Sequence, residues 1–192
     1  MARPREFDHD IALQKALRLF QCCGFEATSM RDLTEAMGLS RSSIYATWGE
    51  KEALYRAALE HYVAAQAEQI AIVLRAEGSP KAAIAALFQR VLELVLSDRE
   101  GGCMVVDGTT ELALHHPGVA QIMTDNLETN RRAFAEVIRR GQNQGEFDIN
   151  KDADALAIFL VNAIQGLRVI GKVTDDRQTL EDIVEVTLQI LN

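Results

Sequence analysis

The chain has 192 residues, with 20 lysines and arginines against 28 aspartates and glutamates, and a formal net charge of −8 at pH 7. Its 48% hydrophobic and 25% charged residues are typical of a folded globular protein and exclude extensive disorder. Its three cysteines are odd in number and lack the paired spacing of metal ligands, which argues against a disulfide framework or a zinc site and favours the cytoplasm.

The beginning of the chain shows no targeting segment. The first residues, MARPREFDHD, are polar and lack the apolar stretch of a signal peptide. Farther along, the apolar run ALAIFLV at 155–161 is much too short to cross a bilayer. We therefore expect no membrane association.

Helical periodicity begins near residue 9. The first helix is predicted to end at Gly24, and Cys22 and Cys23 near that end are interpreted as packing residues. Its apolar stripe consists of Ala12, Ala16, Leu19, Phe20 and Cys23.

Two short helical patterns follow, at about 29–37 and 40–48. Ser29 and Asp32 have the spacing of a capping box, although Thr28 could equally cap the helix. Gly38 permits the left-handed backbone of a tight helix–helix corner, and Ser40 is the expected N-cap of the next helix. These features predict a helix-turn-helix.

The remaining elements are also predicted to be helices, and strict alternation is almost absent. Their expected ranges are 51–76, 80–97, 103–115, 118–143, 152–172 and 177–191. The predicted fold is all-α, with a three-helix domain at 1–56 followed by a larger helical domain at 57–192.

The charge is divided unevenly between these two parts. Residues 1–56 hold eight basic and eight acidic side chains, whereas residues 57–192 hold twelve basic and twenty acidic ones. The acidic part would repel DNA, so any DNA contact must use a local face of the first part.

The helix-turn-helix offers such a face. Packing of Leu33, Met37 and Ile44 would leave short hydroxyl groups and cations outward, and an α-helix fits the major groove of B-DNA. Arg41, Ser42 and Ser43 are the candidates for base recognition. Other residues of the set given below are expected to contact phosphates. Arg3 and Arg5, in the segment before the first helix, could add further contacts. The full predicted DNA-binding set is Thr28, Ser29, Arg31, Ser40, Arg41, Ser42, Ser43, Tyr45, Thr47 and Lys51.

Residues 8–56 resemble the N-terminal domain of the TetR family of transcriptional regulators, through the stretch GFEATSMRDLTEAMGLSRSSIYATWGEKEAL. Thr34 stands where the family usually has alanine, and Trp48 replaces the commoner phenylalanine. Ala46 and Thr47 replace a bulkier pair near the DNA, so the resemblance does not imply an operator sequence. The residues that match the family pattern are Thr28, Arg31, Leu33, Gly38, Leu39, Ser40, Tyr45, Trp48 and Lys51.

The C-terminal segments suggest a subunit interface. Residues 155–170 contain twelve apolar residues out of sixteen, which indicates burial on two sides, although a centrally buried helix of a monomer would show the same pattern. The residues predicted to form a homodimer interface are Leu156, Phe159, Ala163, Gly166, Leu167, Ile170, Leu180, Ile183, Val184, Thr187 and Leu191.

The segment from GGCMVVDG to DALAIFLVNAIQGLRV is similar to one C-terminal branch of the same family. This resemblance implies that the last two helices form a dimer and that the helices at 57–145 enclose a small-molecule effector. The alternative is that the candidate lining residues are ordinary core or surface positions. These candidates are Met104, Asp107, Thr110, Met123, Phe134 and Ile138.

Cysteine and histidine chemistry gives weaker alternatives. Cys103 at a predicted helix start could sense oxidants or electrophiles, because a helix N-terminus lowers a thiol pKa, or it could be a small buried apolar residue. His115 and His116 precede Pro117 and are interpreted as solvated helix-end residues rather than metal ligands, and we expect no metal or cofactor.

The predicted function is therefore a ligand-responsive, DNA-binding transcriptional repressor. A helical enzyme is not supported, because the sequence shows no nucleophile–base pair, metal-ligand spacing or phosphate-binding loop. The remaining alternative is a helical module that binds protein instead of DNA. Salt dependence separates the two, because phosphate contacts release counterions.

Overall fold

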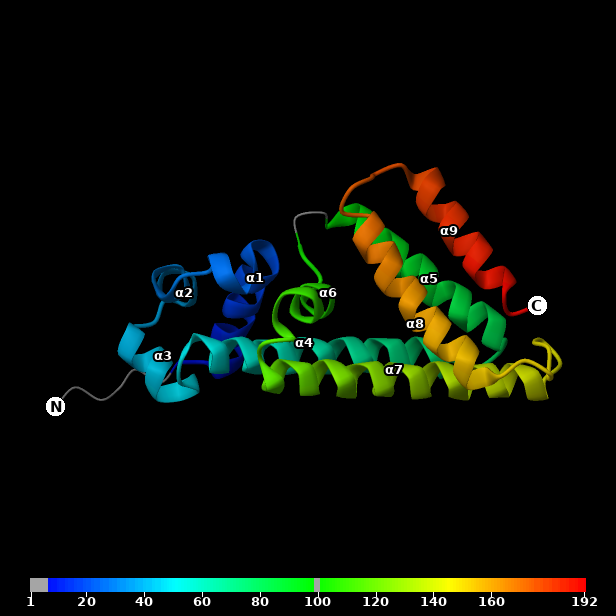
Figure 1. The fold of residues 1–192 in the computed structure, drawn as a ribbon, viewed down its shortest axis with the longest axis horizontal. Helices are drawn as coiled ribbons and strands as arrows, with labels where there is room; N and C mark the ends of the chain where they lie inside the picture. The colour runs from blue at the N-terminus through cyan, green and yellow to red at the C-terminus, as the bar shows by residue number, and fades with distance from the viewer. Residues whose placement is uncertain (1–6, 99–100) are drawn as a thin grey trace. The chain divides into compact units, whose positions relative to one another are not determined.

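The computed structural model describes residues 7–98 and 101–192, and every regular element in these ranges is a helix (Figure 1). The predicted all-α class is confirmed. Arg3 and Arg5, predicted to extend the DNA contact, lie outside the described residues. The helices form two compact units, the N-terminal unit (7–63 and 101–122) and the C-terminal unit (64–98 and 123–192).

The N-terminal unit contains four complete α-helices, a π-helix and parts of two longer helices. Segment 101–122 belongs to this unit although it lies far along the chain, and the predicted functional boundary at residue 56 stays a prediction. The helices are α1 (His9–Ala27), α2 (Met30–Met37), α3 (Arg41–Trp48), the first part of α4 (Lys51–Leu74), α6 (Met104–Asp107), the π-helix η1 (Gly108–Leu112) and the start of α7 (Pro117–Asn143).

A break at Gly24 shapes the end of α1. Its φ of 75° is readily adopted only by glycine, and it turns the chain so that Phe25 enters the core. The rings of Phe20 and Phe25 both meet Tyr55 edge-on, with centroids 5.0 and 5.1 Å away. The prediction that Cys23 packs in the core is wrong, and so is the same prediction for Cys22. Both thiols are exposed, because Phe25 fills the position beyond Phe20.

The core of the N-terminal unit otherwise follows the predicted stripes. Ala16, Leu33 and Ile44 are fully buried, and Met37 is nearly so. Leu39 and Trp48 are only partly buried. Burying a leucine, isoleucine or methionine side chain contributes about 1.5–3 kcal/mol, so this small core fixes the packing of α1 to α3.

Segment 101–122 differs from the single helix predicted at 103–115. A four-residue α-helical turn passes into the π-helix, in which the amide of Ala113 donates to the carbonyl of Gly108 at 3.0 Å. The amide of Gly102 donates to the carbonyl of Gln21 at 2.9 Å, which attaches the segment to α1. Amphipathic periodicity alone does not distinguish such a widened turn from an ordinary helix.

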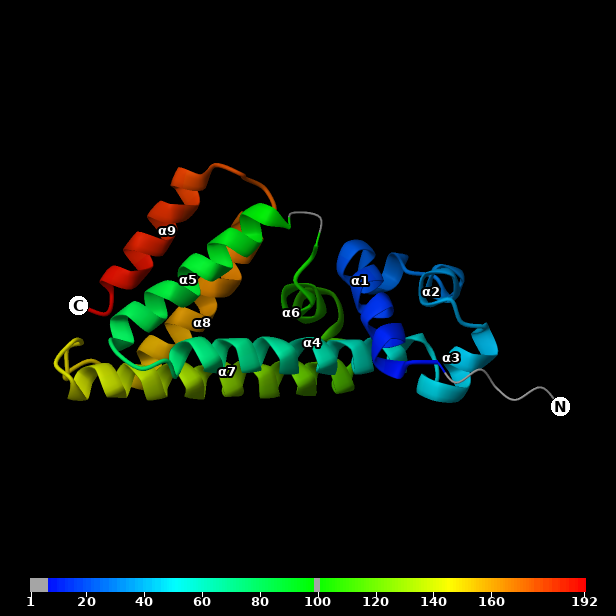
Figure 2. The same cartoon turned by 180° about the vertical axis from the view of Figure 1, so that it is seen from behind.

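The C-terminal unit packs three helices side by side, α5, α8 and α9, as Figures 1 and 2 both show. The second part of α4 and most of α7 complete it. The bounds of the new helices are Pro80–Ser97 for α5, Ala153–Ile170 for α8 and Arg177–Gln189 for α9. Its largest fully buried side chains include Phe88, Phe134, Ile138 and Leu92.

The dimer-interface prediction needs correction for much of α8 and α9. Several of the predicted residues are buried within the unit and cannot form a free surface; they are Leu156, Leu167, Leu180, Val184, Thr187 and Leu191. Ala163 and Ile183 are half-buried, while Phe159, Gly166 and Ile170 are exposed. The apolar stripe facing the core is wider than the sequence pattern indicated.

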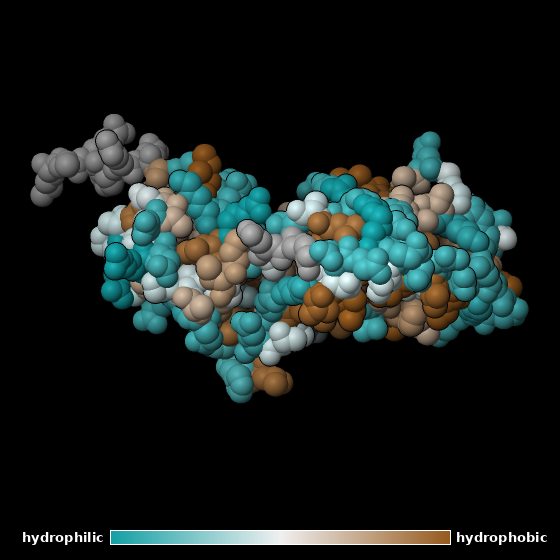
Figure 3. Space-filling model, turned by 90° about the horizontal axis from the view of Figure 1, so that it is seen from above, coloured by the Kyte–Doolittle hydropathy of each residue, from teal (hydrophilic) through white to brown (hydrophobic). Residues whose placement is uncertain are grey.

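Part of α8 is apolar on the outside as well. Ile158, Phe159, Val169 and Ile170 are between 39% and 45% exposed, and Figure 3 shows apolar surface, in brown, at several places on this unit. By length and hydropathy α8 could also cross a membrane, although the core helix of a soluble protein meets the same criteria. Seven of its residues lie in the unit's core, which makes α8 a core helix with an additional apolar face.

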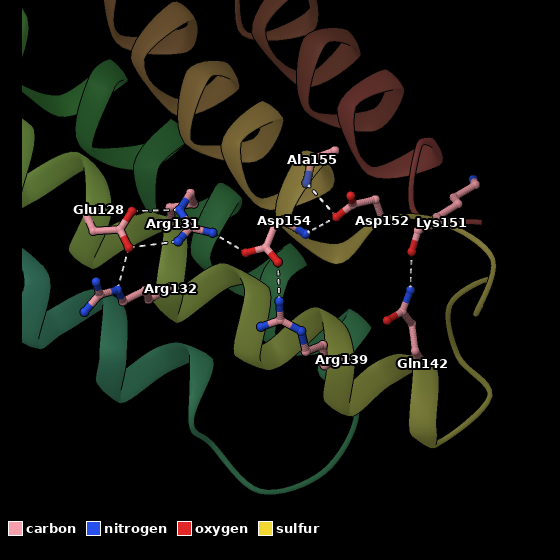
Figure 4. Close-up of polar contacts among 9 residues, drawn as sticks. All are labelled: Glu128, Arg131, Arg132, Arg139, Gln142, Lys151, Asp152, Asp154 and Ala155. Atoms are coloured by element: carbon pink, nitrogen blue, oxygen red, sulfur yellow. Dashed lines mark hydrogen bonds and ion pairs between the residues drawn. The ribbon is translucent and has the colours of Figure 1, made fainter.

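An ionic network fixes the start of α8 on α7 (Figure 4). Arg131 binds both Glu128 and Asp154, and Arg139 also binds Asp154. Glu128 accepts a further hydrogen bond from Arg132. The hydrogen bonds from Arg131 and then Arg132 lower the pKa of Glu128 to about 2.

This lowered pKa predicts an acid-sensitive contribution to stability. Glu128 stabilises the folded state above its ordinary pKa of 4.5, and this contribution is lost as the pH falls from about 4.5 towards 2. We expect Glu128→Gln to give a shallower loss of unfolding free energy than wild type across that window, measured by urea denaturation. Glu185→Gln, on the exposed surface of α9, is the control and should retain the wild-type slope.

Candidate nucleic-acid interface

The α2–α3 corner begins at a complete capping box, as predicted. The hydroxyl of Ser29 accepts from the amide of Asp32 at 3.2 Å, and the Asp32 carboxylate accepts from the amide of Ser29 at 2.9 Å. Hydrogen bonds from Ser29 also lower the pKa of Asp32. Gly38 ends α2 in the left-handed conformation, with φ 69° and ψ 27°, which allows α3 to start three residues later, at Arg41.

The first turn of α3 carries a cluster of hydroxyl groups. Ser40 caps the helix by accepting from the amide of Ser43 at 3.1 Å. Its oxygen also lies 2.9 Å from the Ser42 oxygen and 2.8 Å from the Ser43 oxygen. Only Ile44 of α3 is buried, so the helix presents a polar face of small side chains.

Arg41 and Tyr45 form a pair on this face. The guanidinium of Arg41 donates to the Tyr45 hydroxyl at 3.2 Å and lies 5.5 Å from the centroid of its ring. Both side chains are exposed. Because the contact is in water, it is weak enough to exchange for contacts with a base or phosphate.

Lys51 has a structural function that the sequence analysis missed. Its ammonium donates to the carbonyls of Phe25 at 2.9 Å and Thr28 at 3.1 Å, and lies 4.2 Å from the centroid of the Phe25 ring. These carbonyls lie at the end of α1, where helical backbone acceptors need partners. An ammonium has three donors, so one is left for the phosphate contact predicted for Lys51.

Thr28 is also used within the unit. Its side chain is 1% exposed, and its hydroxyl donates to the carbonyl of Gly24 at 2.6 Å. The hydroxyl therefore supplies a hydrogen-bond donor to the carbonyl of Gly24, where α1 is interrupted. The predicted phosphate contact of Thr28 stays a prediction.

The other predicted DNA contacts lie mostly at the starts of α2 and α3. Ser29 and Arg31 are exposed at the first turn of α2. Thr47, at the other end of α3, is half-buried and donates to the carbonyl of Ser43 at 2.9 Å. The exposed cationic and hydroxyl groups of the corner therefore concentrate near the two helix N-termini, where backbone amides favour anions.

His116 departs from the expected solvated position, whereas His115 is exposed as predicted. The Nδ1 atom of His116 lies 3.2 Å from a carboxylate oxygen of Glu52, and its ring meets the edge of Phe25. The start of α7 is thereby attached to the start of α4 within the N-terminal unit. The prediction of a solvated helix end is wrong for His116, because Pro117 begins α7 beside α4.

Cys103 is 7% exposed and accepts a weak hydrogen bond from the Tyr62 hydroxyl at 3.8 Å. Within the residues that the structure describes, no group of three His, Cys, Asp or Glu side chains could hold a metal ion.

The predicted effector residues are divided between the units. Met104, Asp107 and Thr110 lie in the N-terminal unit and Met123, Phe134 and Ile138 in the C-terminal unit, so their common pocket stays a prediction.

Comparison with known proteins assigns the fold to a family. Residues 12–58 match the model of bacterial regulatory proteins of the tetR family, and residues 80–187 match that of the tetracyclin repressor-like C-terminal domain. The chain belongs to the TetR family. The resemblance found in the sequence is confirmed, and the helix-turn-helix places the protein among DNA-binding transcriptional regulators.

Relatives of similar length agree with this assignment. An uncharacterized HTH-type transcriptional regulator from Bacillus subtilis, YezE, is 32% identical over the full length of both chains. The HTH-type transcriptional repressor ComR of Escherichia coli is 32% identical over 98% of this chain and 90% of its own. A cysteine mutant of the TetR-family regulator CifR, in complex with 26-base-pair operator DNA, is 33% identical over 99% of this chain and 100% of its own, with a TM-score of 0.87.

Removal of the Lys51 ammonium should destabilise the N-terminal unit. In Lys51→Met the stem remains, but two carbonyls lose a charged donor, for which we expect a loss of about 1–3 kcal/mol in unfolding free energy. Thermal and urea unfolding measure this loss. Lys15→Met, at an exposed position of α1, is the control. Equal stability of the two variants would show that the Lys51 bonds contribute nothing to the fold.

Proposed function

We propose that the protein represses transcription by binding operator DNA as a homodimer and releases the DNA when a small molecule binds its C-terminal unit. The observation that carries this proposal is the exposed polar face of α3, with Arg41, Ser42 and Tyr45, on a correctly capped helix-turn-helix. The operator complex of CifR, a regulator with the same fold and 33% identity, supports it.

In this proposal α3 enters the major groove. Short serine side chains let the backbone approach the bases, and Arg41 leaves Tyr45 to donate two hydrogen bonds to a guanine. Tyr45, Arg31, the third donor of Lys51 and the first backbone amides of α2 then bind phosphates. A cytoplasmic location, where operator DNA is accessible, follows from this function.

The outer face of α8 supports the dimer. Phe159, Ile170 and Val186 on α8 and α9 are exposed apolar residues. A Cβ atom built on Gly166 would meet nothing within 4 Å, so this glycine is not required by packing within the chain. It leaves a flat position at which a second copy can approach closely. Two subunits would present two α3 helices to half-sites about 34 Å apart.

Release follows from differential affinity. An effector that binds more tightly to a conformation with unsuitable spacing of the two α3 helices lowers the affinity for the operator. By linkage, the operator lowers the affinity for the effector by the same factor. The function as a whole is tested by selection of bound duplexes from random DNA, followed by salt titration of the selected sequence. Lack of sequence preference at low salt would contradict it.

Substitutions in α3 should separate base recognition from phosphate binding. We expect Arg41→Ala to cost about 1–3 kcal/mol and to relax preference at one base pair, because a bidentate base contact is lost. Tyr45→Ala should weaken binding similarly on all sequences. Fluorescence anisotropy at fixed salt with the selected duplex and its single-base variants measures both effects, and Lys15→Ala on α1 serves as control. Wild-type affinity in both α3 variants would exclude this face.

Enlargement of Gly166 should separate folding from dimer formation. Gly166→Leu has space within the chain and removes a helical glycine that costs about 1 kcal/mol, so subunit stability should not fall. If α8 faces a second copy, the dimer dissociation constant should rise at least tenfold, as measured by sedimentation. Ala86→Leu, on the exposed side of α5, should leave dimerisation unchanged. An unaffected dimer in Gly166→Leu would place the interface elsewhere.

A further inference from the structure

The outward direction of α3 is set by the buried side chain of Ile44. An α-helix turns by about 100° per residue, so Ser42 and Ala46 each lie about 160° around the helix from Ile44, on either side of the direction opposite to it. Both side chains are exposed. When α3 enters the major groove with Ile44 turned towards its own core, these two residues face the base edges most directly.

The contacts on the two flanks of α3 agree with this orientation. Arg41 and Tyr45 pair on one flank, where the guanidinium donates to the phenol oxygen at 3.2 Å. On the other flank, the half-buried Thr47 donates its hydroxyl to the carbonyl of Ser43 at 2.9 Å. Ala46 lies between these flanks, on the strip of the helix that points straight at the DNA.

Ala46 brings only a methyl group to this strip. In the major groove every base edge presents hydrogen-bond donors or acceptors, and thymine adds an apolar group, its 5-methyl. A donor or acceptor held against an apolar side chain loses its water without gaining a partner, which costs free energy. Contact between two methyl groups removes apolar surface from water, which is favourable. The chemistry of Ala46 therefore selects thymine.

The short side chains of this strip also permit the contact sterically. Neither Ser42 nor Ala46 extends beyond one heavy atom from Cβ, so the backbone of α3 can approach the bases closely. A rise of 1.5 Å per residue places the two residues about 6 Å apart along the helix axis. This distance corresponds to about two base-pair steps of 3.4 Å, so they meet separate base pairs.

We propose that Ala46 is a specificity-determining residue, which recognises the 5-methyl group of one thymine in each operator half-site. This inference rests on the proposed binding of operator DNA and adds a base pair to the one that Arg41 recognises. The side chains of Arg41 and Ala46 point about 140° apart around α3, so the thymine and the guanine of Arg41 belong to different base pairs.

Replacement of thymine by 2′-deoxyuridine tests the contact, because the change removes only the 5-methyl group and leaves base pairing intact. Each thymine of the selected operator is replaced singly, and binding of the full-length protein is measured by fluorescence anisotropy at fixed salt. We expect one thymine in each half-site at which deoxyuridine weakens binding about fourfold, the effect of burying one methyl group. Equal affinity for every substituted duplex would overturn the proposal.

A second pair of bases tests the same methyl group without any change to the protein. 5-Methylcytosine carries its methyl group at the same place in the major groove as thymine, whereas cytosine lacks it. At the thymine position identified by deoxyuridine, 5-methylcytosine should bind about fourfold more tightly than cytosine. Equal affinity for these two duplexes would contradict recognition of a methyl group.

Substitutions assign the effect to Ala46. In Ala46→Gly the difference between thymine and deoxyuridine should disappear, because the methyl group has lost its partner. Ala86→Gly is the matched control, since it makes the same change at an exposed position of α5 and should keep the wild-type difference. Tyr45→Ala should bind more weakly and also keep it, which excludes the neighbouring ring as the partner. A wild-type difference in Ala46→Gly would reject the assignment.

Failure of this inference and failure of the proposed function give different results. If the protein selects no duplex from random DNA, both are rejected. Selection of an operator whose affinity is independent of every thymine methyl group would reject the recognition by Ala46 and retain the regulator.

Discussion

The geometry of the DNA-reading corner depends on the junction after Gly24. There the chain leaves α1, and two backbone carbonyls are bound by the ammonium of Lys51, the first residue of α4. The Phe25 ring beneath that ammonium packs against Tyr55 of α4 and against His116 at the start of α7. One lysine thus joins the end of α1 to the beginning of α4, with α2 and α3 held between these two attachments.

In the C-terminal unit, α8 is apolar both on the side that faces the core and on the opposite, exposed side. The core-facing side of α8 packs with α5 and α9, and its start is held on α7 by Asp154 between Arg131 and Arg139. The opposite side retains exposed apolar residues such as Phe159 and Ile170. The composition that resembles a membrane span therefore has a simpler explanation, in which one face fills the core and the other carries the apolar residues that the proposed dimer would cover.

Sequence reasoning predicted features that depend on local chemistry. The caps at Ser29 and Ser40, the left-handed Gly38 and the helical class all follow from neighbouring residues. It failed where distant residues decide the outcome. For Lys51 the sequence predicts only a phosphate contact, because its carbonyl partners at Phe25 and Thr28 are distant in sequence and approach it only in the folded chain. Leu167 and Leu180 are predicted to lie in a subunit interface but are buried in the core of their own unit, because periodicity shows that a stripe is apolar but not what covers it.

The π-helix at Gly108–Leu112 affects how relatives should be aligned with this protein. A π-turn accommodates an additional residue within an otherwise continuous helix and rotates the side chains that follow it. The turn closes where the amide of Ala113 donates to the carbonyl of Gly108. In a homologue with a regular helix at this point, the equivalent residues would be shifted by one position relative to this sequence. Residue equivalences transferred across this segment should therefore be taken from superposed backbones instead of from pairwise sequence matching.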